Sequence, residues 1–251
     1  MATARTLAGV VDLTARFGDA VLPLELDVTD TEQAQHAVAQ AHAHFGRIDV
    51  LLNNAGYTLV GTIEEVRGAD VHALFETNFF GTLRVIQAAL PLLRQQGSGH
   101  ILGVSSGLGI IAVPLIGFYC AFKWAVESLH DSLAQEVKDF GIKVTLIEPG
   151  AYATEFASPA SLKGADSLNA YADLREQMSK NLSSEERGNP QATEEAILQI
   201  VDAEEPPLRF ALGSTVVPMA RAAYADQLAT WEVWEDVSNA AQGEPQKSTV
   251  A

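Results

Sequence analysis

Cysteine is almost absent from this chain of 251 residues, since Cys120 is the only one. A single cysteine cannot form an intrachain disulfide and cannot build a thiolate zinc site. His42 and His44 lie two apart in a helical pattern and point to different sides, so they do not suggest a metal site either. We therefore expect a protein of the reducing cytoplasm that binds no metal.

Basic residues are also scarce: 16 Lys and Arg stand against 32 Asp and Glu, giving a formal net charge of -16. Binding to a nucleic-acid backbone needs a basic surface, so we expect no nucleic-acid partner. No apolar run approaches the roughly 20 residues that cross a bilayer, and residues 1–9 lack the apolar core and cleavage site of a signal peptide. We expect no membrane partner and no export.

Hydrophobic residues make up 47% of the chain, enough for one sizeable core, and we treat residues 1–251 as a single domain. From residue 22, short apolar runs alternate with longer helical patterns, which is typical of an α/β fold with a Rossmann-like, doubly wound parallel sheet. Strands are predicted at 22–28, 48–52, 100–105, 143–148 and 208–212. A helix is predicted to open at Thr29, which stands in capping-box spacing with Glu32, and to close at Gly46. Further helices are predicted over 70–96 with a break at 78–81, and over 118–140, 193–201 and 217–234.

Two segments stand apart from this alternation. Residues 151–190 lack strong strand signals and are longer than an ordinary connection, so we interpret them as a substrate-binding lid. Residues 239–251 are polar and are expected to form a disordered tail.

Polar residues gather where the predicted strands end. Asp27, Asn53, Ser105, Ser106 and Pro149 each lie at or just after the carboxyl end of a strand. Ligands of open parallel sheets bind along this edge. The sequence therefore places the chemistry there.

Tyr119 and Lys123 lie four residues apart at the start of a predicted helix, hence about one turn from each other. A neighbouring ammonium favours the phenolate and lowers a tyrosine pKa from about 10, which suits a general acid/base for an alcohol. This pair alone is also common on helix surfaces. However, Ser106 follows a strand thirteen residues earlier, so its hydroxyl is expected to face the same substrate oxygen.

With these residues, the sequence resembles the short-chain dehydrogenase/reductase family over nearly its whole length. Residues 53–56 read Asn-Asn-Ala-Gly, the motif that follows the fourth strand in that family. The catalytic tetrad of the family corresponds to Asn78, Ser106, Tyr119 and Lys123. Pro149, Gly150 and Thr154 match its PG-x-x-x-T turn, and Asp27-Val28 matches the pair beside the adenine.

The resemblance implies a role for each of these residues. Tyr119 would exchange the proton with the substrate oxygen, which Ser106 positions. Lys123 would bind the nicotinamide ribose and lower the pKa of Tyr119, and Asn78 would hold a water of the proton relay. The cofactor supplies the hydride. The implied cofactor-binding residues are Arg5, Asp27, Val28, Asn53, Ala55, Gly56, Tyr119, Lys123, Pro149, Gly150 and Thr154, and the implied substrate-binding residues are Ser106, Tyr152 and Phe156.

The choice of cofactor follows from residues 2–5, which occupy the place just after the family's second strand. A carboxylate there would bind the ribose 2′-hydroxyl, but none is present. Arg5 offers instead a bidentate contact to a 2′-phosphate. NADP(H) is therefore favoured over NAD(H), although Arg5 could also be a solvated terminal residue.

The resemblance has one departure. The family begins with a strand and a TG-x-x-x-G-x-G loop, and nothing similar precedes Met1, so we expect the N-terminal βα unit to be missing from the chain. Residues 107–112 fit G-x-G-x-x-A, but Val113-Pro114 follows where a helix should run. The alternative function is therefore a noncatalytic protein of this fold with a binding or scaffold role.

A second alternative is a hydrolase, because residues 103–107 fit the G-x-S-x-G elbow. After Ser105 the only histidine is His130, and Glu127 lies on the same predicted helix, so a catalytic triad is not expected.

For substrate, the aromatic and apolar residues of 151–190, including Tyr171 and Met178, predict a medium-sized, mainly apolar alcohol or ketone. Helices at 79–94 and 118–140 carry more apolar positions than one face needs. In the resembling family such helices form an interface, so a homodimer or homotetramer is expected.

Overall fold

The computed structural model describes residues 1–154, 156, 161–183 and 186–243. At its centre lies a parallel sheet of four strands in the spatial order β3-β5-β6-β8. Leu51 pairs with Ile101, and Ile101 pairs with Val144, so apolar side chains align across the sheet. The strands are β3 (Val50–Asn53), β5 (Gly99–Val104), β6 (Ile142–Pro149) and β8 (Arg209–Leu212). The predicted α/β fold with a parallel sheet is confirmed.

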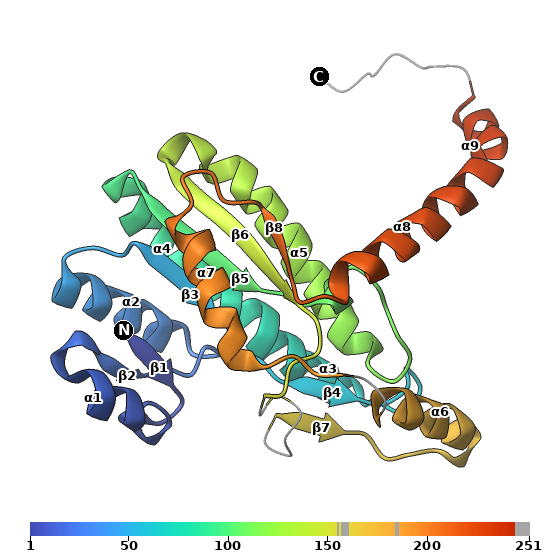
Figure 1. Cartoon of the computed structure of the whole chain (residues 1–251), viewed down its shortest axis with the longest axis horizontal. Helices are drawn as coiled ribbons and strands as arrows, with labels where there is room; N and C mark the ends of the chain where they lie inside the picture. Colours follow the sequence, from blue (N-terminus) through green and yellow to red (C-terminus); the bar gives the residue numbers. More distant parts are fainter. Residues whose placement is uncertain (155, 157–160, 184–185, 244–251) are drawn as a thin grey trace.

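Helices cover both faces of this sheet (Figure 1). The largest core cluster joins buried residues of three helices, among them Val38, Ile86 and Leu133, to Leu51 and Ile101 of the strands. These helices are α2 (Thr31–Phe45), α4 (Gly81–Gln96) and α5 (Gly117–Val137). On the other face, a smaller cluster packs α7 (Thr193–Asp202) against β5 and β6.

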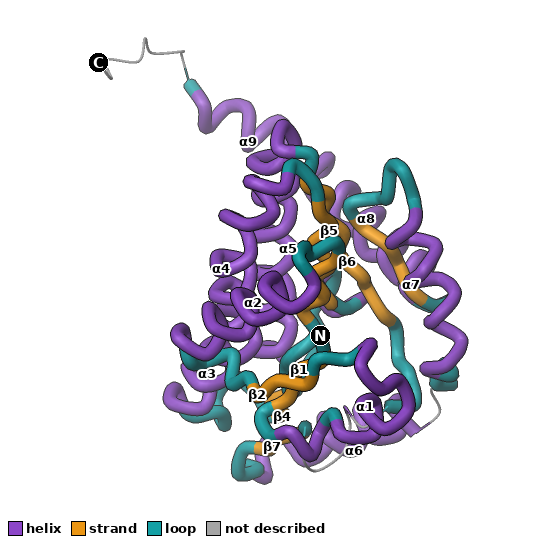
Figure 2. The backbone as a smooth tube through the Cα atoms, turned by 90° about the vertical axis from the view of Figure 1, so that its left-hand side faces the viewer, coloured by secondary structure: helices purple, strands orange, loops and turns teal. Residues whose placement is uncertain are grey.

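The first 25 residues form a βα unit. β1 (Ala2–Ala4) leads through α1 (Val11–Phe17) to β2 (Pro23–Glu25), and the two strands pair in parallel. The expectation that this unit is missing is therefore not supported: residues 2–4 are themselves a strand, too short to show a period in the sequence. In the described chain these strands make a sheet separate from the central one (Figure 2).

The start of α2 differs in detail from its prediction. Thr29 does not cap the helix, because its hydroxyl donates to the carboxylate of Asp27 at 2.7 Å. Asp30 is the cap and accepts from the backbone N–H of Gln33 at 3.0 Å. The helix ends as predicted at Gly46, whose φ of 78° is readily adopted by glycine.

The predicted break near residues 78–81 is confirmed. α3 (Gly68–Phe75) passes through a π-helical turn at Glu76–Phe80 before α4 begins. The turn carries Asn78, and Gly81 follows because a Cβ there would lie 2.5 Å from Val28. Such turns are frequent at functional sites.

The predicted lid contains more regular structure than expected. β7 (Leu162–Gly164) pairs in parallel with β4 (Thr58–Val60), and α6 (Ala172–Ser183) follows. Ion pairing fixes this segment to the body, since Arg175 pairs with Glu65 and holds the pKa of that carboxyl down at about 2. A three-residue strand gives no periodic signal, so the sequence did not predict β7.

The C-terminal part is a helical arm. α8 (Val216–Val233) and α9 (Glu235–Gln242) extend away from the sheet (Figure 1). Residues 239–242 of the expected disordered tail are thus helical, and residues 244–251 lie outside the described residues. Within the described ranges, no helix is both long and apolar enough to cross a membrane.

The close contact between Gly103 and His130 yields a stability test. His130 is fully buried, and a Cβ on Gly103 would lie 2.4 Å from its Nε2 atom. We expect Gly103→Ala to lower the free energy of unfolding by about 1–3 kcal/mol through overpacking. Gly68→Ala is the matched control, because a Cβ at this helix start meets nothing within 4 Å. Urea denaturation measures both, and equal stabilities would contradict the predicted clash.

Candidate active site

Tyr119 and Lys123 lie in the first two turns of α5 and are both buried, with exposed fractions of 6% and 9%. Lys123 Nζ donates to the carbonyl oxygen of Val104 at 2.7 Å and lies 5.6 Å from the centre of the Tyr119 ring. Val104 is the last residue of β5. The ammonium thus ties the helix to the carboxyl end of a central strand.

Ser106 lies two residues beyond the end of that strand. Its Oγ accepts from the backbone N–H of Leu108 at 3.1 Å and starts a 3-10 turn over Gly107–Gly109. Its hydroxyl also hydrogen-bonds with the Tyr119 phenol. The fold therefore brings Ser106, Tyr119 and Lys123 together, as their spacing in the sequence predicted.

The protonation of this group differs from the expectation. Burial raises the pKa of Tyr119, and the hydrogen bond with Ser106 offsets only part of this. Burial also lowers the pKa of Lys123 to about 7, and the negative charge of Glu127, which raises this pKa, offsets only part of the shift. The pKa of Tyr119 is thus raised where the sequence predicted it to be lowered, because burial of the phenol is the largest effect on it.

Asn78 is 2% exposed and fixes the loop after β3. Its Oδ1 accepts from the backbone N–H of Tyr57 at 3.1 Å, and its Nδ2 donates to the Tyr57 carbonyl at 2.8 Å. Gly56 lies so close that a Cβ would come within 3.3 Å of Oδ1. Asn78 therefore positions the Asn-Asn-Ala-Gly segment, and its role in a water relay stays a prediction.

Several predicted cofactor residues lie along the carboxyl ends of the strands. Asn53 ends β3, and its buried Nδ2 has no hydrogen-bond partner among the described residues. Pro149 ends β6, and a Cβ on Gly150 would meet Thr215 Oγ1 at 2.6 Å. Thr154 is exposed and lies in the loop beyond. The unpaired amide of Asn53 and the ammonium of Lys123 are hydrogen-bond donors of the kind that fit the carboxamide and ribose of a nicotinamide nucleotide.

Arg5 and Asp27 lie near each other, just beyond the paired strands β1 and β2. Asp27 has a lowered pKa, chiefly because the backbone and hydroxyl of Thr29 donate to it, with a smaller effect from the charge of Arg5. Arg5 itself is exposed. Val28 packs against Gly81, where an added Cβ would lie 2.5 Å from the Val28 side chain. The Arg5 guanidinium thus lies near enough to Asp27 for its charge to act on that carboxyl, and binding of the adenosine end by these residues stays a prediction.

Of the predicted substrate residues, Phe156 lies beside the reactive group and Tyr152 does not contact it. The ring centres of Phe156 and Tyr119 are 5.8 Å apart. Tyr152 packs against the cluster of Leu102 and Ile147 and bridges to Gly188. A substrate contact of Tyr152 remains a prediction.

A mainly apolar pocket of about 430 Å³ lies between the lid, the loop before α5 and the segment after β4. Tyr171 lines it, and its hydroxyl donates to Glu64 at 2.6 Å. Thr62, Ile63, Glu64, Pro114, Leu115, Tyr171 and Leu174 form its walls. The prediction that Tyr171 belongs to an apolar pocket is supported.

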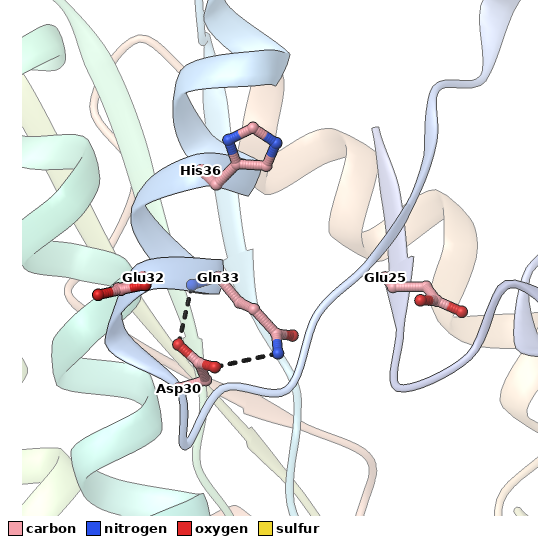
Figure 3. Close-up of a pocket in the computed structure, with 5 residues that line it drawn as sticks. All are labelled: Glu25, Asp30, Glu32, Gln33 and His36. Atoms are coloured by element: carbon pink, nitrogen blue, oxygen red, sulfur yellow. Dashed lines mark hydrogen bonds between the residues drawn. The ribbon is translucent and has the colours of Figure 1, made fainter.

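A second pocket, of about 380 Å³, is shown in Figure 3. Its walls are Glu25, Asp30, Glu32, Gln33 and His36, with Asp30 bonded to Gln33. Three carboxylates repel a phosphate-bearing ligand. This pocket therefore does not fit a dinucleotide. Ser106, Tyr119 and Lys123 lie outside the walls of both pockets.

The hydrolase alternative is not compatible with the structure. Ser105 is 2% exposed, so it cannot present a nucleophile. His130 Nδ1 bonds to the carbonyl of Val126 on its own helix, and Nε2 faces Gly103. The strand-to-helix elbow is replaced by the short turn over Gly107–Gly109.

A buried carboxyl pair was missed by the sequence analysis. Glu127 and Glu148 are 7% and 3% exposed, and Arg209 Nε lies 3.1 Å and 3.8 Å from their respective oxygens. Burial, followed by the charge of Glu127, raises the pKa of Glu148 to about 7. Glu127 lies one helical turn beyond Lys123, a spacing that could have suggested a counter-charge.

The pair predicts a pH dependence of stability. The pKa of Glu148 is raised from 4.5 to about 7, so folding favours the protonated form. Its contribution is complete below about pH 4.5 and is lost as the pH rises through about 7. We expect Glu148→Gln to keep the protein more stable at pH 8, by up to about 3 kcal/mol, and to flatten the profile from pH 4.5 to 7. Glu136→Gln, at an exposed position of α5, is the control, and an unchanged profile for Glu148→Gln would contradict the assignment.

A parallel sheet with a Ser, Tyr and Lys group at its carboxyl edge defines a class of dehydrogenases, and comparison with known proteins identifies it. The family model described as "short chain dehydrogenase" matches residues 2–164. "Oxidoreductase BOA17" of Botryotinia fuckeliana is 39% identical over 242 residues, covering 95% of this chain and 88% of that protein. The chain belongs to the short-chain dehydrogenase family and is an oxidoreductase.

Two further relatives have named substrates. "3-Ketodihydrosphingosine reductase" of Bacteroides thetaiotaomicron is 37% identical over 196 residues, covering 77% of this chain and 73% of that protein. Human "Retinol dehydrogenase 8" is 35% identical over 222 residues, covering 83% and 70%. These names describe the relatives.

Solved structures agree with the fold. A short-chain dehydrogenase from Streptomyces avermitilis has a TM-score of 0.86 and 36% identity, covering 95% of this chain and 87% of that one. A Burkholderia cenocepacia enzyme in complex with NADP has a TM-score of 0.71 and 22% identity, with coverage of 92% and 83%. A Burkholderia phymatum enzyme in complex with NAD has a TM-score of 0.72 and 22% identity, covering 98% of this chain and 85% of that one. Structural neighbours therefore bind either nicotinamide cofactor.

Proposed function

We propose that this oxidoreductase interconverts a secondary alcohol and a carbonyl on a medium-sized, mainly apolar substrate, with NADP(H) as cofactor. The observation that carries this proposal is the joining of Ser106, Tyr119 and Lys123 at the carboxyl end of β5, with Phe156 5.8 Å from Tyr119. A hydroxyl donor, a general acid and a cation then face one substrate oxygen.

Each side chain has a distinct task in the proposed reaction. The bound cofactor supplies or accepts the hydride. In the reducing direction, Tyr119 donates its proton to the substrate oxygen, and its raised pKa keeps that proton in place beforehand. The Ser106 hydroxyl orients the oxygen. Lys123 is bonded to Val104 near the phenol, and the negative charge of the phenolate that forms favours the protonated form of this lysine.

The proposed preference for NADP(H) rests on Arg5. Its exposed guanidinium lies near enough to Asp27 to act on that carboxyl, so it borders the adenosine end of the site. A 2′-phosphate there would form a charge-assisted contact with Arg5.

The proposed substrate class rests on the pocket lined by Ile63, Leu115 and Leu174. Its mainly apolar walls favour a hydrocarbon group over a charged one. Two relatives are named for retinol and for 3-ketodihydrosphingosine, an apolar polyene alcohol and a long-chain ketone. The substrate partner is therefore proposed to be an apolar small-molecule alcohol or ketone.

The acid/base assignment is tested with Tyr119→Phe. Removing the hydroxyl removes the proton donor, so we expect turnover of apolar ketones to fall at least about 1000-fold. NADPH affinity, measured by fluorescence titration with NADH as comparator, should change less than about threefold and should exceed NADH affinity in both proteins. Tyr224→Phe, on the distant arm, is the control. Retained turnover in Tyr119→Phe would refute the assignment.

The pocket is tested with Leu174→Glu. A carboxylate in the apolar wall should raise the KM for long-chain ketones by about tenfold or more, because the hydrocarbon must pack against a charge. The KM for ketones of four or five carbons should change little. Leu198→Glu on α7, 57% exposed and outside the pocket, is the control. An equal effect on short and long ketones would argue against substrate binding in this pocket.

A further inference from the structure

The arm formed by α8 and α9 exposes an apolar stripe. Val217, Tyr224, Leu228 and Trp231 are separated by seven, four and three residues, so a helix of 100° per residue places them on one face. Their exposed fractions are 50%, 51%, 54% and 60%. Large apolar side chains in such a row mark an interaction surface.

The body of the same chain does not cover this stripe. The arm is anchored at its root, where Val216 is fully buried and Met219 lies against Gly107. Beyond that root it leads away from the sheet (Figure 1). None of the described residues covers the stripe, so it is available to a second molecule.

The charges of the arm indicate which kind of partner can cover the apolar stripe. Among residues 216–242, Arg221 near the start is the one basic residue, while Asp226, Glu232, Glu235 and Asp236 are acidic. An excess of acid repels an anionic lipid surface. A second arm running antiparallel, in contrast, brings its acidic end to Arg221, whereas a parallel arm would set like charges against each other.

We propose that the arm is a homodimer interface, in which α8 of one chain packs antiparallel against α8 of a second copy. The twofold axis passes close to Leu228, so Tyr224 faces Trp231 of the partner subunit and Arg221 faces Glu235 of the partner subunit. A stripe that pairs with itself in this way is self-complementary, as a twofold dimer requires. The spacing of three, four and seven residues is that of paired helices.

Leu228→Asp tests the proposal. Near a twofold axis one substitution places two carboxylates together, so we expect the dimer to dissociate at least about tenfold more readily. Val233→Asp is the matched control: Val233 is 79% exposed but lies five residues on, about 140° around the helix from Leu228. Analytical ultracentrifugation of the full chain measures the mass, and circular dichroism verifies that both variants are folded.

A cysteine variant provides a second readout. Leu228→Cys should form an intermolecular disulfide on mild oxidation, whereas Val233→Cys should not; the native Cys120 is buried and is common to both. A dimer that resists Leu228→Asp and does not crosslink through residue 228 would overturn the proposal and indicate another interface, such as the predicted helices at 79–94 and 118–140. A monomeric wild type would overturn it as well. Binding of that monomer to phosphatidylcholine vesicles, lost in Leu228→Asp, would assign the stripe to a membrane surface instead.

Discussion

The hydrogen bond from the buried ammonium of Lys123 to the carbonyl of Val104 connects the two elements on which the site depends. Val104 ends β5, and Lys123 lies one turn beyond Tyr119 on α5. Because this bond fixes the helix against the strand, the phenol meets the hydroxyl of Ser106 at the end of the same strand. A buried ammonium is costly unless it is bonded and counter-charged, so the surroundings of Lys123 are constrained as well.

The constraint extends to a buried network behind the reactive group. Glu127 supplies the counter-charge for Lys123, and Arg209 contacts the carboxyls of Glu127 and Glu148. Glu148 lies close enough to Glu127 for the charge of Glu127 to raise its pKa. The network draws on α5, β6 and β8. Charge balance in the core thus links the reactive helix to the far edge of the sheet, where the root of the arm also lies.

The lid and the C-terminal arm are held to the body by contacts outside this buried network. The lid is held through Glu65, which pairs with Arg175 and accepts from the backbone of Leu168, so polar contacts set its place over the apolar pocket. The arm is held at its root by apolar packing against the turn that follows Ser106. The proposed substrate pocket and the proposed dimer interface therefore both lie on segments outside the central sheet.

Local pattern in the sequence determined the main elements. Apolar runs marked the four central strands, and helical spacing marked the helix at 31–45, because each of these elements is long enough to show its period in the sequence. The break near Asn78 was predicted as an interruption of such a helical pattern. The same reading placed Ser106, Tyr119 and Lys123 at one sheet edge, because parallel strands end on the same side.

Features that depend on distant contacts needed the tertiary structure. β1 and β7 have three residues each and exist only through pairing with β2 and β4. The protonation of Tyr119 and Lys123 follows from burial, which residue spacing does not report. The pair of Glu127 and Glu148 is separated by 21 residues along the chain, and the exposure of the arm depends on where its helix leaves the body. Sequence periodicity specifies which face of an element is apolar, but only packing decides what that face meets.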